Sequence, residues 1–351
     1  MGKINPIIKS DLDYIISTDI NWGKLEGKTI LISGANGFLP AYLVETVLYL
    51  NDNVFKIKTQ ILALVRNKQK ALARFVHYMD RTDLQFIIQD VCKPIVIESN
   101  LDYIVHAASL ASPKYYKDFP VDVLLPNVVG TYNLLELARS KKITGFLLFS
   151  SGEIYGEIDE QFMPVKEQDC GYLDSMQVRS CYAQSKRIAE TMCISWGQQY
   201  GVSIKVVRPF HTYGPQMPLN DGRVFSDFVA NIVRGEDIVL KSDGLSKRAF
   251  CYLADATVAY FTVLLHGEVG AAYNVGNNNC EISILELANM LIKLFPEDNL
   301  KVVMEQRSDT YLVSKVYRSL PDTQKLEKLG WKPKYSLEDG FNNTVQSFKL
   351  K

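Results

Sequence analysis

Tyr182 and Lys186 form the strongest chemical pattern in the sequence, because their spacing of four residues places a phenol and an ammonium on one helix face. We expect the cation to lower the pKa of the phenol, so that Tyr182 can take or give a proton near neutral pH. Ser151 ends a predicted strand upstream and would hydrogen-bond the same substrate oxygen. A tyrosine and a lysine four apart also occur on solvated helices, but this serine and the glycine-containing turn described next favour catalysis.

The segment from Gly34 to Pro40 joins a predicted strand to a predicted helix. Glycines in such a turn let backbone amides approach a pyrophosphate at the positive end of the helix. The segment therefore predicts a dinucleotide site, with a plain strand-to-helix turn as the competing interpretation. The candidate cofactor contacts here are Gly34, Asn36, Gly37, Phe38 and Leu39.

The end of the second predicted strand indicates which dinucleotide is bound. An acidic residue there would accept the ribose hydroxyls of NAD, whereas this chain has Arg66, Asn67 and Lys68. A cation suits the 2′-phosphate of NADP, so we expect NAD(P) as cofactor, with NADP(H) favoured over NAD(H). A solvated basic loop is an equal alternative, because residues between Asn51 and Gln60 blur the register.

Short apolar runs alternate with amphipathic segments from Lys28 onward, which predicts βαβ units. The expected strands are 29–33, 60–65, 84–89, 103–106, 145–150 and 203–207, with helices around 127–140 and 182–200. The predicted fold class is α/β, a doubly wound parallel Rossmann sheet with a smaller α/β substrate-binding lobe.

Three parts are expected along the chain. Residues 1–27 form an N-terminal arm, in which Ser10 and Asp13 resemble a capping box that opens a helix. Residues 28–208 form the NAD(P)-binding Rossmann domain. Residues 209–351 form mainly the substrate-binding lobe, with some elements returning to the main sheet.

Composition limits the choice of partner. Lys plus Arg equals Asp plus Glu at 39 each, so no global field attracts nucleic acid, and any anion site must be local. No signal peptide is visible, and no apolar run is long enough to span a membrane. The six cysteines form no CxxC pair, and we expect buried free thiols in a reducing cytoplasm and no metal.

The chain resembles extended short-chain dehydrogenases/reductases from about Lys28 to about Gly340, in particular UDP-glucuronate decarboxylases and dTDP-sugar dehydratases and reductases. The matching stretches are Asp90–Val91, His106–Ala108, Asn127–Thr131, Arg179–Tyr182, Thr212–Pro215 and Tyr273–Asn277. The resemblance implies that Asp90 and Val91 face the adenine and that Ala107 and Ala108 lie beside the cofactor. One departure is Pro40, which stands where the family usually has a third glycine.

A nucleotide-diphosphate sugar is the substrate class that the resemblance implies. Arg248 matches an arginine that binds the diphosphate, which suits its forked guanidinium, although a surface charge remains the alternative. His211 stands where relatives commonly have asparagine. The candidate substrate contacts are Ser112, Arg179, His211, Thr212, Arg223 and Arg248.

The residues after Ser151 discriminate among the reactions of the family. Dehydratases have Asp-Glu there, and decarboxylases have Ser-Glu with a late arginine three residues before an Asp or Ser. This chain has Gly152 and Glu153, and its Arg318 lies four residues before Asp322. Glu153 is therefore a catalytic candidate, although a strand-end carboxylate can also simply accept backbone amides.

Ser151, Tyr182 and Lys186 are all that a ketoreductase needs besides reduced cofactor. We therefore expect first a dTDP-4-keto-6-deoxyhexose reductase, then a UDP-glucuronate decarboxylase, then a nucleotide-sugar 4-epimerase. A nucleotide-sensing scaffold without chemistry is disfavoured, because Tyr182 and Lys186 are both present. The family also implies a homodimer through the two helices at 127–140 and 182–200.

Overall fold

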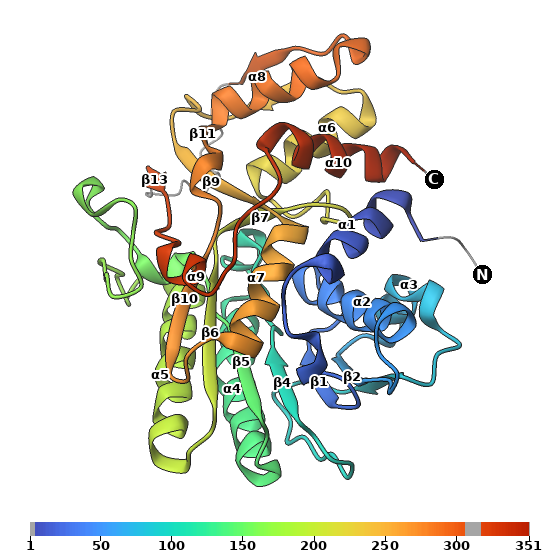
Figure 1. Ribbon diagram of the computed structural model, residues 1–351. Coiled ribbons are helices and arrows are strands. Elements are labelled where there is room, and N and C mark those ends of the chain that lie inside the picture. The colour runs from blue at the N-terminus through green and yellow to red at the C-terminus, as the bar shows by residue number, and fades with distance from the viewer. Residues whose placement is uncertain (1–3, 306–316, 351) are drawn as a thin grey trace.

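A seven-stranded, wholly parallel sheet forms the centre of the molecule, whose computed structural model describes residues 4–305 and 317–350 (Figure 1). The strand order is β10-β6-β5-β4-β1-β2-β3, and every neighbouring pair is parallel. The sheet strands are β1 Thr29–Ser33, β2 Gln60–Val65, β3 Leu84–Ile88, β4 Tyr103–His106, β5 Gly145–Phe149, β6 Ile204–Pro209 and β10 Ala271–Val275. The predicted fold class is confirmed.

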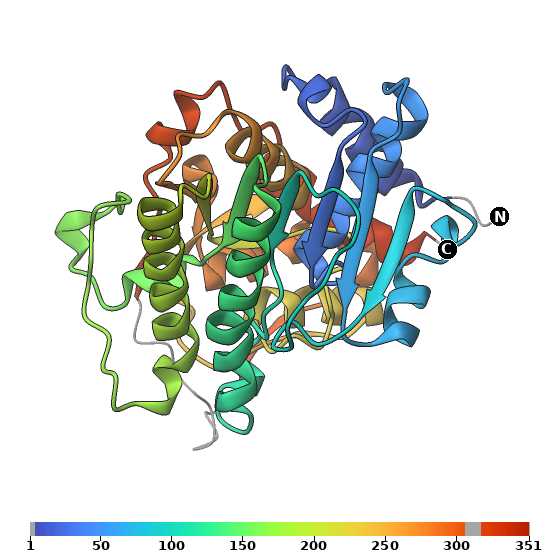
Figure 2. The same cartoon turned by 90° about the horizontal axis from the view of Figure 1, so that it is seen from below.

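Helices cover both faces of this sheet, as near-continuously buried parallel strands require. Helices α4 and α5 pack side by side on one face (Figure 2), while α7 contacts α2 and strands β5, β6 and β10. The helices of this part are α2 Phe38–Asn53, α3 Lys68–Arg74, α4 Pro120–Lys141, α5 Cys181–Tyr200, α7 Leu253–His266 and α9 Gln324–Glu327. The strand order reverses between β1 and β4, and this is where ligands bind in open α/β sheets.

The second lobe is built on two small sheets. Strand β9 pairs with β7, β11 and β13, and strand β8 pairs with β12. The strands are β7 His211–Tyr213, β8 Ile238–Leu240, β9 Lys247–Tyr252, β11 Glu281–Ser283, β12 Val302–Met304 and β13 Arg318–Ser319. The helices are α6 Val224–Arg234, α8 Ile284–Leu294 and α10 Leu337–Lys349.

The N-terminal arm forms a helix, α1, at Pro6–Ser17, which contacts α2, α7 and α10. Our capping-box prediction at Ser10 is wrong, because Asn5 caps the helix: its side-chain oxygen accepts the Ile7 amide at 3.0 Å. Pro6 then occupies the first turn, where its missing N–H costs nothing.

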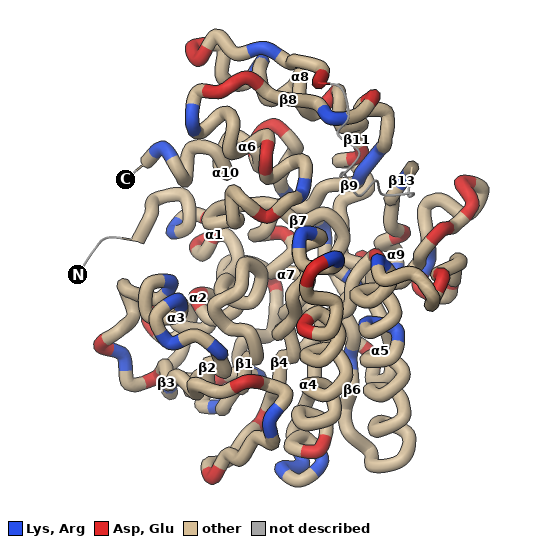
Figure 3. Tube along the Cα trace, turned by 180° about the vertical axis from the view of Figure 1, so that it is seen from behind, with Lys and Arg blue, Asp and Glu red and all other residues tan. Residues whose placement is uncertain are grey.

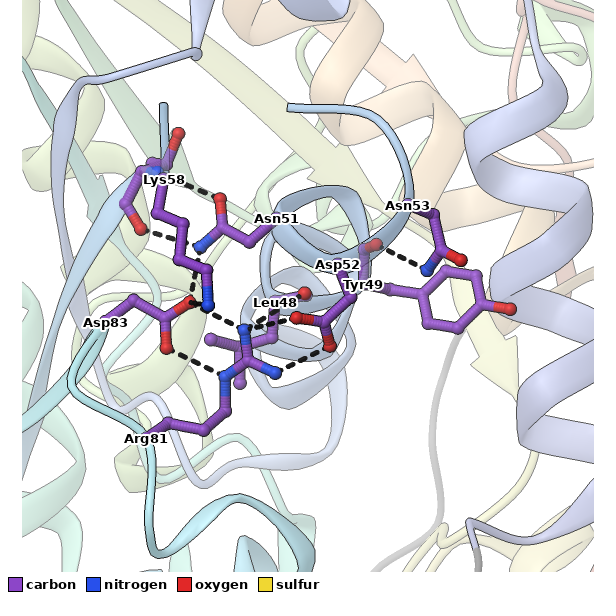
Figure 4. A network of polar contacts seen from close by, with 9 residues as sticks. Leu48, Tyr49, Asn51, Asp52, Asn53, Lys58, Arg81 and Asp83 are labelled. Carbon is purple, nitrogen blue, oxygen red and sulfur yellow. Dashed lines mark hydrogen bonds and ion pairs between the residues drawn. The ribbon is translucent and has the colours of Figure 1, made fainter. Parts of the chain in front are cut away.

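The segment between α2 and β2 is held by a polar network around Arg81 (Figure 4). The Arg81 guanidinium bonds Asp83 at 2.6 Å and Asp52 at 2.6 Å, joining the strand β3 approach to the end of α2. Asn51 donates to Asp83 at 2.9 Å and to the Thr59 carbonyl at 2.8 Å. These bonds fix the register that the sequence left open, and β2 ends at Val65, directly before Arg66.

Basic and acidic residues are interspersed over both lobes (Figure 3), in keeping with the equal totals of 39 each. Across residues 4–305 and 317–350, no helix combines the length and apolar character needed to cross a bilayer. Of the six free cysteines, Cys193, Cys251 and Cys280 are buried as expected, but Cys170 is exposed.

Candidate active site

The turn after β1 closes against the end of β4 at the reversal of strand order. Gly34 has φ +67° there, and a Cβ at this position would come within 2.8 Å of the Ala108 Cα. Ser33 supports the contact, because its hydroxyl accepts the amides of Ala107 and Ala108 at 3.1 and 3.2 Å. Glycine is therefore required at 34, both for its backbone angle and for this approach.

Helix α2 follows this turn directly. It begins at Phe38, with Gly37 as N-cap and no side chain capping it. The first-turn amides of a helix have no partner within the helix and form an anion site. Pro40 packs within this turn and removes one N–H donor, so the amides of Phe38 and Leu39 are the ones that can meet a pyrophosphate.

The buried polar atoms without a hydrogen-bond partner among the described residues include Ser109 Oγ and His106 Nε2 at the end of β4, Ser150 Oγ after β5, and Asn127 Oδ1 of α4. Buried polar atoms are rarely left unpaired in folded proteins. Their position beside the glycine turn fits a nicotinamide nucleotide, whose ribose and amide groups would bond them. Asn127 is held for this by its donation to Ser185 Oγ at 2.9 Å.

The predicted adenosine contacts lie along the ends of β2 and β3. Arg66 is exposed directly after β2, and the Asp90 carboxylate accepts the Cys92 amide at 2.9 Å. Val91 is buried against Gly130, where an added Cβ would lie 2.8 Å from its side chain. Asp90 and Val91 thus form a fixed turn at this edge.

Ser151, Tyr182 and Lys186 converge at the carboxyl end of β5. Tyr182 and Lys186 are buried on α5, with the Lys186 Nζ 5.8 Å from the centre of the Tyr182 ring. The Ser151 side chain lies close enough to the Tyr182 phenol to act on its pKa, which it lowers, and its hydroxyl accepts the Glu153 amide at 3.1 Å. Lys186 donates to the Phe149 carbonyl at 2.6 Å, which anchors the ammonium to β5.

The expected lowering of the Tyr182 pKa is not what the structure shows. Burial raises the pKa of Tyr182 to about 12, and the nearby Glu153 charge acts in the same direction. Burial also lowers the pKa of Lys186 to about 7. Both shifts reflect the removal of charged side chains from water. The positive charge of an oxidised nicotinamide would lower both pKa values.

A stack of side chains that sequence reasoning missed covers Tyr182. The Tyr116 ring lies parallel to Tyr182 with 5.3 Å between centroids, and the Arg179 guanidinium lies 4.9 Å over Tyr116. Tyr116 is fully buried and donates to the Ala111 carbonyl at 3.0 Å. The adjacent tyrosines 115 and 116 after β4 were the available signal, but no spacing rule links them to α5.

Glu153 forms an ion pair with Arg179, at 3.0 Å between Oε2 and Nη1. The Glu153 charge also acts on Arg248, opposing the burial that lowers the Arg248 pKa to about 10. Arg223 and Arg248 together help burial depress the pKa of His211, so His211 is neutral. The charges of Arg179, Arg223 and Arg248 thus act on groups of this site, which suits an anionic ligand, while Arg248 itself donates to the Lys247 and Tyr317 carbonyls at 2.7 and 3.0 Å.

Three further predicted substrate contacts have partners within the protein. The Ser112 hydroxyl donates to the Asp221 carbonyl, and Arg223 donates to the Ala111 carbonyl at 3.0 Å, so these residues tie the two lobes together. Thr212 is buried, and its hydroxyl donates to the Phe210 carbonyl at 3.3 Å. Both the Ser112 and Thr212 hydroxyls bond backbone carbonyls, and their contact with substrate stays a prediction.

The two departures from the decarboxylase pattern have visible structural partners. Gly152 lies against the Phe210 ring, where an added Cβ would come within 3.1 Å. Arg318 forms two bonds with Glu281, at 2.6 and 2.8 Å. The Phe210 ring thus occupies the space that a side chain at position 152 would need. Glu281 of β11 holds Arg318 of β13.

Residues 30–276 match the sequence pattern of the NAD dependent epimerase/dehydratase family. The chain belongs to this family. The expectation of an NAD-dependent enzyme of the short-chain dehydrogenase type is confirmed by this match. Among curated proteins it is 34% identical over 324 residues to UDP-glucuronic acid decarboxylase 5 of Arabidopsis thaliana, covering 92% of this chain and 89% of the relative. It is 33% identical to UDP-glucuronic acid decarboxylase 1 of Xenopus tropicalis, covering 92% and 72%.

Solved structures of this epimerase/dehydratase fold superpose over nearly the whole chain. Epimerase Mth375 from Methanothermobacter thermautotrophicus gives a TM-score of 0.80 at 20% identity, covering 99% of this chain and 96% of the other. UDP-glucose 4-epimerase from Thermotoga maritima gives 0.77 at 22% identity, covering 92% and 98%. These likenesses support the fold.

Proposed function

We propose that this member of the family is a UDP-glucuronate decarboxylase, which oxidises the sugar at C4, releases CO₂ and reduces the product again. The observation that carries the proposal is Glu153, held by Arg179 beside Ser151 and Tyr182. The curated relatives named for this activity, at 34% and 33% identity, support it. The reductase expected first from the sequence has no such support, so we propose the decarboxylase instead.

A nicotinamide cofactor, when bound, would supply the hydride chemistry needed at C4. Tyr182 would take the proton of the C4 hydroxyl, and Ser151, close to the phenol, would orient that oxygen. Lys186 is held to Phe149, within reach of the phenol and of a nicotinamide ribose. The arrangement of these three groups would serve either direction of proton transfer at the C4 oxygen.

The resulting C4 ketone lies two carbons from the C6 carboxylate, so the sugar becomes a β-keto acid. Breaking the C5–C6 bond releases CO₂ and leaves its electron pair as an enolate on the C4 oxygen. The Tyr182 hydroxyl would hydrogen-bond that oxygen. Protonation at C5 and reduction of the C4 ketone would then complete a redox-neutral reaction, with the Glu153–Arg179 pair beside the reacting carbons.

The nucleotide would extend from the arginines into an open pocket of about 350 Å³ beside α6. Its apolar lining includes Leu219, Val224 and Phe228, and its polar lining includes Asp227 and Lys241. Asp227 lies one helical turn after Arg223, so a diphosphate at Arg223 and Arg248 would place a nucleoside against this pocket. Apolar walls with a few polar groups are typical of base-binding pockets.

A nucleotide-sugar 4-epimerase is the second candidate, favoured by Arg318. Its two bonds to Glu281 leave that arginine held away from a substrate carboxylate. An epimerase needs the same oxidation by Tyr182 but no carboxylate handling, so it would tolerate this pairing.

Incubation with UDP-glucuronate and, in parallel samples, NAD or NADP separates these reactions by mass spectrometry of the nucleotide sugar. Loss of CO₂ to give a UDP-linked pentose supports the decarboxylase. An unchanged mass with inverted C4, detected by NMR, would replace it with the epimerase. Glu153→Gln should reduce CO₂ release while leaving C4 oxidation detectable as cofactor reduction. If UDP-glucuronate is not consumed at all, the proposal fails.

We infer that Arg66 receives the adenosine ribose and favours NADP(H), because the described end of β2 offers this cation where NAD sites have a carboxylate. The test is calorimetric binding of NAD and NADP to the wild type and to Arg66→Asp. The variant should shift preference toward NAD. Unchanged preference would mean that Arg66 is only a solvated charge.

We also propose a homodimer through α4 and α5. These neighbouring helices expose Leu125 at 36%, Tyr132 at 49% and Ile188 at 48%. Leu125 and Tyr132 are seven residues apart and share a face of α4. Clustered exposed apolar side chains of this kind are common at protein interfaces.

A further inference from the structure

A carboxylate lies inside the apolar stripe of the N-terminal helix. Ile8, Leu12 and Ile15 face the core at helical spacing, and Asp11, on the same face, is fully buried. Burying a carboxylate costs free energy unless strong hydrogen bonds compensate, so a helix that only filled space would carry an apolar residue here. The partners of Asp11 therefore indicate a specific task.

Asp11 accepts hydrogen bonds from phenols on three separate elements. Tyr42 of α2 donates to Oδ2 at 3.0 Å, and Tyr252 of β9 donates to the same oxygen at 2.9 Å. Tyr335, which precedes α10, reaches Oδ1 at 3.4 Å. One side chain of the arm thus joins the cofactor-binding lobe, through α2, to the substrate lobe, through β9.

A second buried carboxylate, Asp255 of α7, reinforces the junction. It accepts the Tyr14 hydroxyl at 3.0 Å and the amides of Lys334 and Tyr335 at 3.0 Å each. The Lys334 ammonium lies 4.3 Å over the Tyr14 ring. The arm is therefore fixed by two adjacent carboxylates, one its own and one from α7.

Strand β9 connects this junction to the substrate site. Tyr252 ends the strand that carries Arg248, and β9 pairs with β7 so that Phe250 lies opposite His211. A displacement of Tyr252 would pass along the strand to Arg248 and across the ladder to His211. Both are groups that the proposed function assigns to the diphosphate and sugar.

We propose that the N-terminal arm is a brace between the two lobes, in which Asp11 is a positioning residue that holds β9, and with it Arg248 and His211, opposite the catalytic tyrosine. The substrate-binding part of this proposal rests on the proposed function. The bracing of β9 stands on the hydrogen bonds alone and can be tested without any ligand.

Two variants make a matched pair, because each removes one tyrosine hydroxyl that donates to the Asp11 carboxylate. Tyr252→Phe cuts the bond from Asp11 to β9, and Tyr42→Phe cuts the bond to α2. Hydrogen–deuterium exchange of the ligand-free protein should quicken across residues 247–252 in Tyr252→Phe and stay at the wild-type rate there in Tyr42→Phe. Equal exchange of β9 in both variants and the wild type would overturn the brace.

Calorimetry with UDP and NADP as probes then tests the functional consequence. Tyr252→Phe should weaken UDP binding about tenfold, the effect of one lost charge-assisted hydrogen bond, and leave NADP binding within about twofold. Equal weakening of both ligands would indicate a general loss of folding and contradict a positioning role. Absence of UDP binding in the wild type would refute the proposed function, while the exchange comparison would still decide the brace.

Discussion

Tyr182 is the residue on which all the candidate reactions depend. Tyr182→Phe removes the proposed proton carrier and keeps the ring, so turnover should fall about 10²- to 10⁴-fold in a coupled nucleotide-sugar assay. Cofactor affinity should be unchanged. Tyr116→Phe is the control, because it keeps the stack on Tyr182 and loses only the bond to Ala111. A comparable fall in the control would mean that packing, not proton transfer, was disturbed.

Lys186 should make stability depend on pH in a predictable direction. Its folded pKa of about 7 lies below the ordinary 10.5, so between these values the unfolded chain binds more protons. Stability of the ligand-free protein therefore rises with pH across this window. Below the folded pKa of Lys186, the full free-energy cost of burying its charged ammonium is present. Lys186→Met, which lacks the charge, should gain most over the wild type at pH about 6 and least at pH about 9. Urea unfolding at both values measures this; a gap that widens with pH would contradict the buried ammonium.

Gly152 and Phe210 should behave as a coupled pair. Gly152→Ser forces the Phe210 ring to move, because the new Cβ would lie 3.1 Å from it, and should cost about 1–3 kcal/mol. Phe210→Leu should relieve part of this cost in the double variant, as a double-mutant cycle in urea would measure. Strict additivity of the two single changes would show that the ring does not set the residue at 152.

At the scale of elements, the two carboxylates that fix α1 should give the opposite pH dependence. Burial raises the pKa of Asp11 to about 7 and of Asp255 to about 6, from an ordinary 3.8. The folded state binds more protons in this window, so stability falls as pH rises through it. The groups facing Asp11 are three tyrosines and Asp255, and Lys334 lies near Asp255.

Asp11→Asn should flatten this fall between pH about 5 and pH about 8 in urea unfolding. The control is Asp13→Asn on the same helix, whose carboxylate is exposed and pairs with Lys9 at 2.8 Å. It should leave the slope unchanged. A slope that persists in Asp11→Asn would assign the effect to Asp255 or elsewhere.

The pattern of apolar residues made most helices and strands predictable. Elements and contacts that depend on segments far apart in the sequence could not be predicted. The bounds of β1, β2 and β4 match the expected 29–33, 60–65 and 103–106, because buried parallel strands are short apolar runs between turns. Strand β10 was not among the expected six, since Ala271–Val275 joins β6 only through tertiary contacts. The Tyr182–Lys186 spacing could be read locally, whereas the Tyr116 stack and the Ser112–Asp221 bond join segments far apart in sequence.

At the scale of the whole molecule, the proposed dimer makes a test of α4 and α5. Ile188→Arg should place a charge in the interface and shift the sedimentation coefficient to that of a monomer. Val96→Arg, at a site 83% exposed in the loop after β3, is the control and should sediment as the wild type does. A wild type that is monomeric at micromolar concentration would refute the dimer.

The three phenols that hold Asp11 are made at very different times. Tyr42 follows the arm almost at once, but Tyr335 lies 324 residues after Asp11. At ribosomal rates of about 5 to 20 residues per second, roughly 16 to 65 s separate the synthesis of Asp11 from that of Tyr335. The arm can first meet α2 alone, with Ile8, Leu12 and Ile15 only partly covered. Its locking onto β9 is therefore a late event in biosynthesis, and a nascent chain stalled before β9 should leave the arm open to proteases.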